Sequence, residues 1–366
     1  MQRCSDVLII GGGIIGLAIA LELRWRGADV TLITRRFSEA ATHAAAGMLA
    51  PQAEQLSGAM LELCVQSRDR YAEWTQKLEA LTGMETGYWP CGILAPLYQA
   101  ELSDLDATVA QELADERIWC DRAQLETLQP GLSEAAIASW WYPQDGQVDN
   151  RALAKALWSA VQSAGVTICE GVEVSAWQTQ GRAIAHVETS IGQLQAKHYI
   201  LATGAWSQDL LPIPVTPRKG QMLSVQAPVS EPLPLQRVLF GNEIYIVPRQ
   251  DGRIVLGATS ENVGFTPGNT PAGMDQLLQA AMRLVPALQD YSIQEFWWGF
   301  RPATPDELPI LGASPYDNLT LATGHYRNGI LLAPITAKLI ADWVHENTVD
   351  PLLEYFHWSR FAIAQT

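Results

Sequence analysis

The chain has 366 residues, of which 48% are hydrophobic and 17% are charged. This length predicts two domains, or one domain with a large insertion, and the composition excludes a chain that is disordered throughout. The formal net charge of −15 argues against general nucleic-acid binding and against attachment to anionic membrane surfaces.

The five cysteines are scattered along the chain and show no C-x-x-C spacing. This pattern is typical of a reducing compartment, so we expect a cytoplasmic protein without a disulfide framework, a zinc site or another metal site. The apolar N-terminal region is interrupted by a glycine cluster, and no stop-transfer segment follows it. We therefore expect a core strand and helix there, not a signal peptide or a membrane span.

The first 34 residues predict a βαβ unit that binds a dinucleotide. We expect a strand at 6–10, a helix at 17–26 and a second strand at 28–34. Gly11, Gly13 and Gly16 stand between the first strand and the helix in the G-x-G-x-x-G register. In this context the glycines permit a tight turn, a close approach of the pyrophosphate and close helix packing, and the helix N-terminus attracts phosphate.

The residue that ends the second strand departs from this pattern. An acidic side chain there usually binds the ribose hydroxyls, whereas this chain has Thr34 followed by Arg35 and Arg36. Arginines at this place favour a 2′-phosphate, so an NADP-binding reductase remains an alternative.

The rest of the chain alternates between the two kinds of secondary structure. We expect helices at 60–81, 101–116, 122–129, 150–164, 271–288 and 330–345. We expect strands at 92–96, 136–142, 166–169, 172–177, 222–225, 244–247, 253–257, 295–301, 309–312 and 319–323. A further apolar strand leads into Ala202, Thr203 and Gly204, a pattern that passes beside the FAD pyrophosphate in flavoproteins with two dinucleotide-binding domains.

The predicted fold class is an α/β FAD-binding Rossmann-type domain plus a mixed α+β substrate domain with a largely antiparallel sheet. The FAD-binding domain is expected to be discontinuous, at 1–83, 146–217 and 305–366. The substrate domain is expected at 84–145 and 218–304.

Four blocks of sequence resemble the D-amino-acid oxidase superfamily of FAD amine oxidases, and within it the glycine oxidases of thiamin biosynthesis. The blocks are 6–16; 44–49 with Glu54 beyond it; 245–249 with 257–259; and 296–302 with 324–334. They follow the family order over nearly the whole chain, and Gly324-His-Tyr-Arg-Asn-Gly-Ile-Leu-Leu-Ala-Pro334 is the most specific.

The resemblance implies FAD as the cofactor and places a set of residues beside it. These are Ile14, Ile15, Thr34, Arg35, Ala41, Thr42, Ala46, Gly47, Met48, Val174, His325, Tyr326, Arg327, Asn328, Gly329, Ile330 and Leu331. The position of the family acid is occupied by Thr34. We therefore expect the ribose to be bound by Ser38, Glu39 or backbone groups instead. Some relatives attach FAD through a histidine just before Ala-Ala-Gly; His43 lies one residue too early for that, so we expect non-covalent FAD.

The resemblance also implies a substrate site for a small amine, whose Cα would pass a hydride to flavin N5. Arg301 is the candidate for the substrate carboxylate, because a guanidinium pairs bidentately with that group. Tyr245 is a second donor to the carboxylate, Arg327 lies at the mouth of the site or at the flavin edge, and Met48 limits substrate size. A helix starting near Gly329 would point its positive end at the flavin.

The function expected from these features is the oxidative deamination of glycine, other small amines or small D-amino acids. Its products would be an imino acid or glyoxylate, ammonia and, with molecular oxygen as acceptor, hydrogen peroxide, with a hand-off of the imine to thiazole synthase. A homo-oligomer is possible. Two alternatives remain open beside the NADP reductase: a D-amino-acid or sarcosine dehydrogenase with a non-oxygen acceptor, and a non-catalytic flavin-binding subunit.

Overall fold

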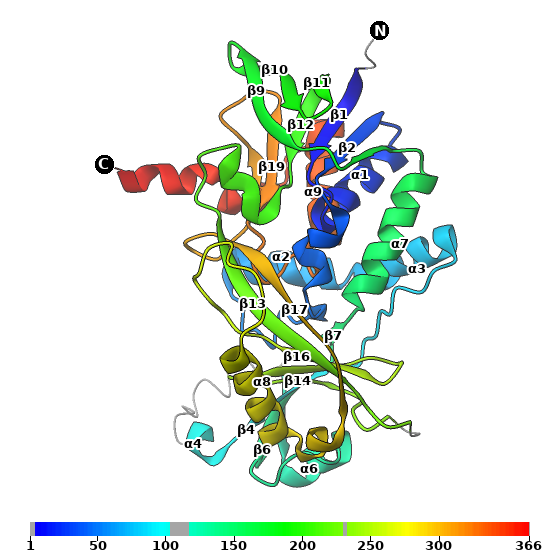
Figure 1. Cartoon of the computed structure of the whole chain (residues 1–366), viewed down its shortest axis with the longest axis vertical. Coiled ribbons are helices and arrows are strands. Elements are labelled where there is room, and N and C mark those ends of the chain that lie inside the picture. The colour runs from blue at the N-terminus through cyan, green and yellow to red at the C-terminus, as the bar shows by residue number, and fades with distance from the viewer. Residues whose placement is uncertain (1–3, 103–116, 230–232, 366) are drawn as a thin grey trace.

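The computed structural model describes residues 4–102, 117–229 and 233–365, and its strands form two large sheets, one above the other in Figure 1. Of the acidic helix predicted at 101–116, residues 103–116 lie outside the described residues. The first two residues belong to α4 (Gln99–Leu102).

The first sheet is parallel except at one edge. Within the described residues its order is β18 (Ile310–Ala313), β19 (Leu319–Thr323), β12 (Ala196–Leu201), β1 (Ser5–Ile10), β2 (Val30–Thr34) and β8 (Thr167–Glu170). The edge strand β18 is the antiparallel one. Its central strands are continuous apolar runs because both faces of a parallel sheet are covered.

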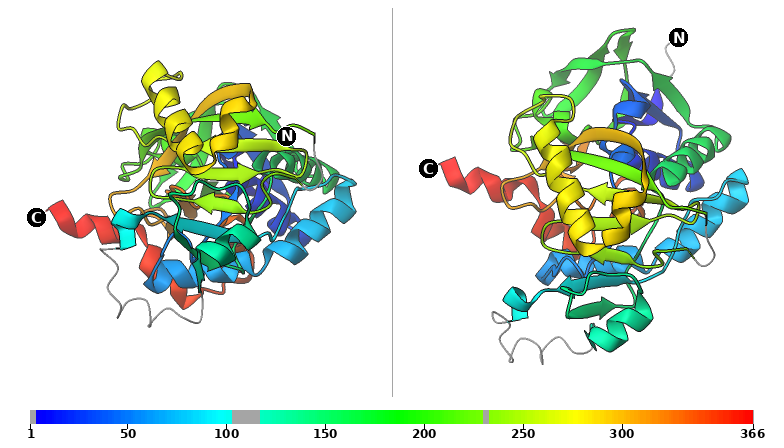
Figure 2. Two further views of the ribbon diagram at one scale, coloured as in Figure 1. Left: turned by 90° about the horizontal axis from the view of Figure 1, so that it is seen from below. Right: turned by 60° about the horizontal axis from the view of Figure 1, so that its bottom comes forward.

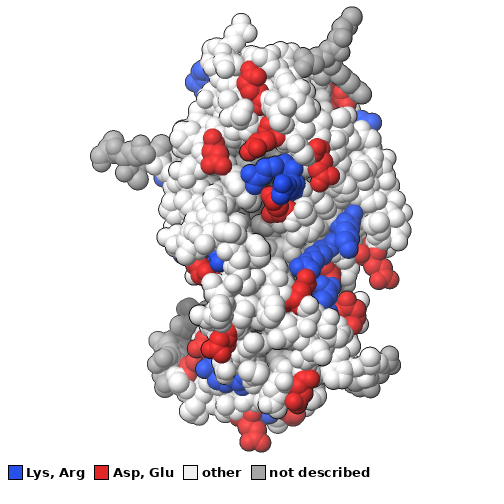
Figure 3. All heavy atoms as spheres, viewed as in Figure 1, with Lys and Arg blue, Asp and Glu red and all other residues white. Residues whose placement is uncertain are grey.

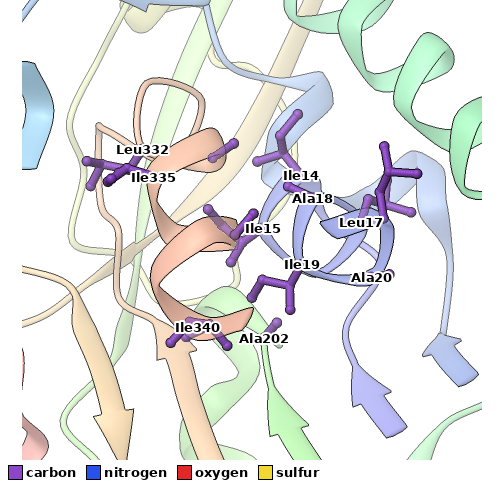
Figure 4. Close-up of a cluster of buried hydrophobic side chains, with 14 of the residues drawn as sticks. Ile14, Ile15, Leu17, Ala18, Ile19, Ala20, Ala202, Leu332, Ile335 and Ile340 are labelled. Carbon is purple, nitrogen blue, oxygen red and sulfur yellow. The ribbon is translucent and has the colours of Figure 1, made fainter. Parts of the chain in front are cut away.

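One face of the first sheet carries the helices α1 (Ile14–Trp25), α7 (Asn150–Ser163) and α9 (Ala333–Glu346). In Figure 4 the side chains of Ile15 and Ile19 lie on the side of α1 that faces α9. The other face packs against a small antiparallel sheet of β9 (Val174–Gln180), β10 (Ala183–Thr189) and β11 (Gly192–Leu194). The glycine turn before α1 is thereby fixed between a buried strand and a buried helix.

The second sheet is antiparallel apart from the parallel pair β14 and β4. Among the described residues its order is β17 (Ser292–Ala303), β13 (Thr216–Gln226), β16 (Arg253–Gly257), β15 (Tyr245–Pro248), β14 (Val238–Phe240), β4 (Ile93–Leu97), β6 (Ala138–Tyr142) and β5 (Ile118–Asp121). The helix α8 (Pro271–Leu284) covers one face, as Figure 2 shows. A second apolar cluster lies on this sheet and includes Met222 and Val255.

The chain passes between the two sheets four times, because β4, β5 and β6 interrupt the first sheet and β13 to β17 interrupt it again. This order of strands agrees with the predicted discontinuity of the FAD-binding domain. The residue boundaries of the two domains remain a prediction. The remaining elements are β3 (Met48–Leu49), which pairs with β7 (Gly146–Gln147), and the helices α2 (Gly58–Arg68), α3 (Tyr71–Thr82) and α6 (Arg122–Leu128).

A buried arginine connects the second sheet to the segment that joins the two sheets. The guanidinium of Arg249, which follows β15, donates to the carbonyl oxygens of Ala46 at 2.7 Å and Val148 at 3.1 Å. It also donates to the side chain of Asn150, the first residue of α7, at 3.3 Å.

Several predicted helices differ from the observed ones. The helix predicted at 60–81 is broken at Asp69 and Arg70 into α2 and α3, and the apolar spacing hides the break because Tyr71 and Trp74 are also buried. The helix predicted at 271–288 ends at Leu284, and a 3-10 helix begins at Pro286, which cannot donate to an α-helical hydrogen bond. The helix predicted from 330 starts at Ala333.

The charged side chains are mixed on the face drawn in Figure 3, where Lys and Arg stand next to Asp and Glu instead of forming a continuous basic surface. Among the described residues, every helix is too short or too polar to cross a bilayer.

Candidate active site

A cavity of about 1290 Å³ lies between the two sheets. It is lined at one end by the glycine turn after β1 and the loop after β12, and at the other end by β13, β15, β16 and β17. Its volume exceeds the roughly 300–1,000 Å³ of a typical small-ligand pocket. The cavity therefore has room for a dinucleotide and a small substrate together.

The glycine turn fits a pyrophosphate. A Cβ atom on Gly11 would lie 2.2 Å from the carbonyl oxygen of Ala202, and one on Gly16 would lie 1.9 Å from the carbonyl oxygen of Gly11. By contrast, a Cβ on Gly13 would approach no atom closer than 3.7 Å, so this glycine leaves the backbone open to a ligand. The first and third glycines are thus required by packing, and Gly13 faces free space beside the N-terminus of α1.

The N-terminus of α1 supplies the donors. Gly13 is the N-cap and offers no side-chain cap, and the N–H of Ile14 donates to the hydroxyl of Thr42 at 2.9 Å. The other N–H groups of a first turn have no partner within their helix. Ile14, Ile15 and Thr42 all line the cavity, as the resemblance implies for FAD-binding residues.

The end of β2 lacks the usual acid but has one nearby. The side chain of Thr34 is buried against Gly12, whose Cβ position lies 2.6 Å from Thr34 Cβ. Five residues later, Glu39 lines the cavity and binds Arg36 at 2.7 Å and Arg35 at 3.5 Å. Glu39 therefore supplies a carboxylate at this end of the cavity, whereas Thr34, the residue at the usual position, has none.

The opposite end of the cavity is shaped by two glycines on neighbouring strands. A Cβ on Gly220 of β13 would lie 2.5 Å from Arg301 Nη1, and a Cβ on Gly257 of β16 would lie 2.6 Å from the hydroxyl of Tyr245. Tyr245 pairs directly with Gly257 across the strands. Sequence reasoning missed the role of these glycines, because it depends on strand pairing that sequence spacing does not give.

Arg301 and Tyr245 come together in this chamber. Arg301 donates to the Thr259 carbonyl oxygen at 3.1 Å, and the Arg301 and Tyr245 side chains lie over Gly220 and Gly257, on the neighbouring strands β13 and β16. Burial raises the pKa of Tyr245, although Arg301 opposes this effect, so the phenol keeps its proton. The Tyr245 hydroxyl also lies 3.7 Å from Met222 Sδ, a second lining residue that sequence reasoning missed. Met48 lines the same cavity.

Most of the other predicted site residues line the cavity as well. They are Arg35, Ala41, Ala46, Gly47, Val174, Ala202, Thr203, Gly204, His325, Tyr326, Arg327, Gly329 and Ile330. Gly16, Asn328 and Leu331 are not among the lining residues; Gly16 packs on Gly11, and Leu331 is in the core. The helix predicted to start near Gly329 begins only at Ala333, because residues 329–332 form turns.

Glu54 is the lining residue of greatest chemical interest that the sequence left without a role. It lines the cavity together with Arg301 and Arg327. Burial raises the pKa of this carboxyl group, and the two arginines and Asn328 oppose the rise. The sequence placed Glu54 in a family block but gave it no role, because a single acid in the segment Ala-Glu-Gln does not indicate its chemistry.

His43 is directed away from the cavity. Its ring packs edge-on against Phe37, with the ring centres 4.6 Å apart, and it is not among the residues that line the cavity. This position agrees with a cofactor that is bound without a covalent link to His43.

One buried histidine, His325, and one half-buried histidine, His198, predict acid sensitivity of the fold. Burial lowers the pKa of His198 to about 4 and that of His325 to about 3. Because these values lie below the ordinary 6.5, protonation favours the unfolded state. Protonation of these histidines should therefore not reduce the free energy of unfolding above pH 6.5. Below pH 6.5, each histidine should reduce the free energy of unfolding by about 1.4 kcal/mol per pH unit, until the pH reaches its folded pKa.

The measurement is urea unfolding of the wild type and His198→Gln between pH 7 and 4.5. His198 does not line the cavity, so cofactor binding is left intact. Comparing the two proteins at each pH cancels other groups, such as Asp145, whose pKa burial raises to about 7. A difference in unfolding free energy that stays constant with pH would contradict the assignment.

The comparisons with known proteins decide the family. The sequence pattern of the FAD dependent oxidoreductase family matches residues 6–343. The chain belongs to the FAD dependent oxidoreductase family. The resemblance stated above is thereby confirmed, and FAD is its cofactor.

Several relatives lie within this family. The chain is 36% identical to glycine oxidase of Geobacillus kaustophilus over 94% of both chains. The crystal structure of a glycine oxidase from that organism has a TM-score of 0.91 and 34% identity, covering 98% of this chain and 99% of that one, which confirms the fold class. An iminodiacetate oxidase from Chelativorans has a TM-score of 0.87 and 28% identity, covering 96% of this chain and 98% of that one.

Longer relatives match as well. The chain is 61% identical to the bifunctional protein ThiO/ThiG of Nostoc over 97% of its own length and 55% of that protein's length. The chain thus spans about half the length of these curated relatives.

Proposed function

We propose that the chain is an oxidase of glycine and other small amines or D-amino acids. The observation that carries this proposal is that Arg301 and Tyr245 line the same cavity as the glycine turn. A guanidinium and a protonated phenol form a binding site for one carboxylate. The names and the coverage of the glycine oxidase relatives support the same assignment.

FAD, when bound, supplies the hydride acceptor for the substrate Cα. We assign its binding to the predicted residues. The pyrophosphate end is assigned to Gly11, Gly13, Ile14, Ile15, Gly16, Thr42, Ala202, Thr203 and Gly204. The adenosine end is assigned to Thr34, Arg35, Ala41 and Val174. The flavin ring is assigned to Ala46, Gly47, Met48 and residues 325–331. Gly16, Asn328 and Leu331 act through packing, since they do not line the cavity.

The chain's own side chains orient the substrate. Arg301 and Tyr245 take the carboxylate, and this directs the amino group and Cα toward the side of the chamber where Met48 lies. Met48 restricts the size of the Cα substituent, and Arg327 lies at the mouth of the site or at the flavin edge. The products are the imino acid, or glyoxylate after its hydrolysis, with ammonia and, after reoxidation by molecular oxygen, hydrogen peroxide.

The thiamin connection rests on the ThiO/ThiG relatives, in which one polypeptide carries both names. We propose that the imine passes to a thiazole synthase. The homo-oligomer and the cytoplasmic location stay predictions.

The decisive experiment is steady-state turnover of the purified yellow protein with a panel of glycine, sarcosine and D-alanine, followed by peroxide formation. Turnover with oxygen supports the oxidase. Reduction of the flavin by glycine without reoxidation by oxygen in stopped flow would instead indicate a dehydrogenase, and absence of flavin reduction by every amine would indicate a non-catalytic subunit.

Glu39 gives a separate prediction for cofactor affinity. We assign the ribose hydroxyls to Glu39, because Ser38 does not line the cavity and Thr34 is held against Gly12. Loss of a charge-assisted hydrogen bond of about 1.5 kcal/mol should weaken FAD binding roughly tenfold in Glu39→Gln. Titration of the apoprotein with FAD by fluorescence checks this, and unchanged affinity would remove Glu39 from the role.

A further inference from the structure

The guanidinium of Arg301 is oriented by the backbone of two neighbouring segments. A Cβ atom on Gly220 would lie 2.5 Å, 2.6 Å and 2.7 Å from Arg301 Nη1, Nη2 and Cζ, so the guanidinium lies face-on over that glycine. Gly220 therefore fixes the plane of the group. Within this plane, Nη1 donates to the Thr259 carbonyl oxygen at 3.1 Å. The direction in which the other N–H groups point thus depends on where the Thr259 carbonyl is held.

Thr259 is held by all of its polar groups. It is buried, although it lines the cavity. Its N–H donates to the Gln221 carbonyl oxygen at 3.2 Å, and its hydroxyl accepts from the Gln221 N–H at 2.9 Å. The same hydroxyl donates to the carboxylate of Glu261. The position of the Thr259 carbonyl oxygen is therefore tied to Gln221 and Glu261.

Glu261 lies at the centre of this polar cluster and does not line the cavity. Its carboxylate accepts from Gln221 Nε2 at 2.7 Å and lies 3.6 Å from Nζ of Lys219, a buried lysine. The backbones of Glu261 and Lys219 also pair, through N–H···O bonds of 2.9 Å and 3.0 Å. Burial alone would raise the pKa of this carboxyl group, but its hydrogen bonds and the charge of Lys219 together lower it below its usual range, so the group is charged at neutral pH.

We propose that Glu261 is a positioning residue that acts through Thr259 to hold the Arg301 guanidinium in the orientation that binds a carboxylate. This inference rests on the proposed oxidase function and adds to it a residue outside the cavity. A charged carboxylate makes stronger hydrogen bonds than a neutral acceptor, so it holds the Thr259 hydroxyl firmly. Bidentate binding requires both the plane and the rotation of the guanidinium to be correct, and a displacement of about 1 Å can cost about a hundredfold in rate.

The test is Glu261→Ala, with glycine as the substrate and acetate as a ligand that is not oxidised. KM for glycine should rise about tenfold while kcat changes less than about twofold, because the variant disturbs carboxylate binding and leaves the reacting atoms in place. The dissociation constant of acetate, read from the flavin absorbance, should rise by a similar factor. Glu261→Gln keeps an oxygen that accepts from the Thr259 hydroxyl, so it should restore most of the wild-type affinity.

A double-mutant cycle distinguishes positioning from general support of the fold. In an Arg301→Ala enzyme, adding Glu261→Ala should change KM by less than about twofold, because no guanidinium remains to be positioned. A role in the fold alone would add its full loss to the Arg301→Ala enzyme. Thr259→Val removes the hydroxyl and keeps the carbonyl, and it should also raise KM with little change in kcat. This variant gives an independent measurement should Glu261→Ala fold poorly.

The matched control is Glu295→Ala. Glu295 lies on β17, the strand that carries Arg301, and pairs with Arg151 at 2.5 Å, but it does not line the cavity. Its replacement removes an acid and breaks an ion pair on the same sheet. KM for glycine and the affinity for acetate should be unaltered in this variant.

The outcomes separate this inference from the proposed function. A wild type that oxidises no small amine overturns the proposed function, while acetate binding still tests the coupling of Glu261 to Arg301. A wild type that neither oxidises amines nor binds acetate overturns both. Unchanged KM and acetate affinity in Glu261→Ala overturn the role of Glu261, and so does a loss of the same size with and without Arg301.

Discussion

Replacing Arg301 by alanine is expected to raise KM for glycine by about 10- to 150-fold while FAD remains bound. Hydrogen bonds to charged groups contribute about 1.5–3 kcal/mol, and this range corresponds to that factor in affinity. The guanidinium lies against Gly220 and lines the cavity with Tyr245, so in the proposed function its loss removes the principal partner of the substrate carboxylate. Steady-state kinetics with glycine and the flavin spectrum of each variant provide the measurement.

Two further variants make this result specific. Arg301→Lys keeps the charge but loses the bidentate fork, so its KM should lie between those of the wild type and Arg301→Ala. The control is Arg218→Ala. Arg218 lies opposite Arg301 in the register of β13 and β17, but it does not line the cavity. The KM of this variant should therefore be unaltered. An Arg301→Ala enzyme with wild-type KM would exclude Arg301 from carboxylate binding.

Gly11→Ala is expected to abolish FAD binding and to destabilise the fold. The added Cβ would lie 2.2 Å from the carbonyl oxygen and 2.5 Å from the carbonyl carbon of Ala202, and both are backbone atoms that are held in the sheet. Gly11 also has a φ of +118°, which L-residues with a side chain rarely adopt. The turn must therefore move away from the cofactor position.

The control is Gly27→Ala, because Gly27 has a φ of +93° but no atom within 4 Å of its Cβ position. It should lose about 1–2 kcal/mol of stability and keep its flavin. Flavin absorbance per mole of purified protein and thermal unfolding of both variants are the measurements. Normal flavin content in Gly11→Ala would refute the close packing of this turn.

The sequence was most informative where local rules and tertiary packing agree. The strand predicted at 6–10 is observed at Ser5–Ile10, and the strand predicted at 28–34 at Val30–Thr34, because their apolar runs are buried on both faces. The helix predicted at 17–26 begins earlier, at Ile14, because Gly13 acts as its N-cap. Arg301 and Tyr245 were found because a family motif carries them.

The features that sequence reasoning missed depend on contacts between distant segments. Gly220 and Gly257 are unremarkable along the chain, and their role follows only from the strands that bring Arg301 and Tyr245 over them. Glu54 shares the cavity with Arg301 and Arg327 only because distant segments of the chain fold together. The start of α9 at Ala333 could have been predicted from the sequence, because proline is typical of the first turn of a helix and Pro334 is the second residue of α9.

The passage of the chain between the sheets has a consequence for synthesis on the ribosome. β1 pairs with β2 on one side and with β12 on the other, where Ser5 lies opposite Ala196. The second pairing can form only after about half of the chain has been synthesised. β12 in turn pairs with β19 at residues 319–321. At about 5–20 residues per second, the nascent glycine turn remains without its supporting strand for roughly 10–40 s. The cofactor can therefore act as a folding ligand only after β12 has been synthesised.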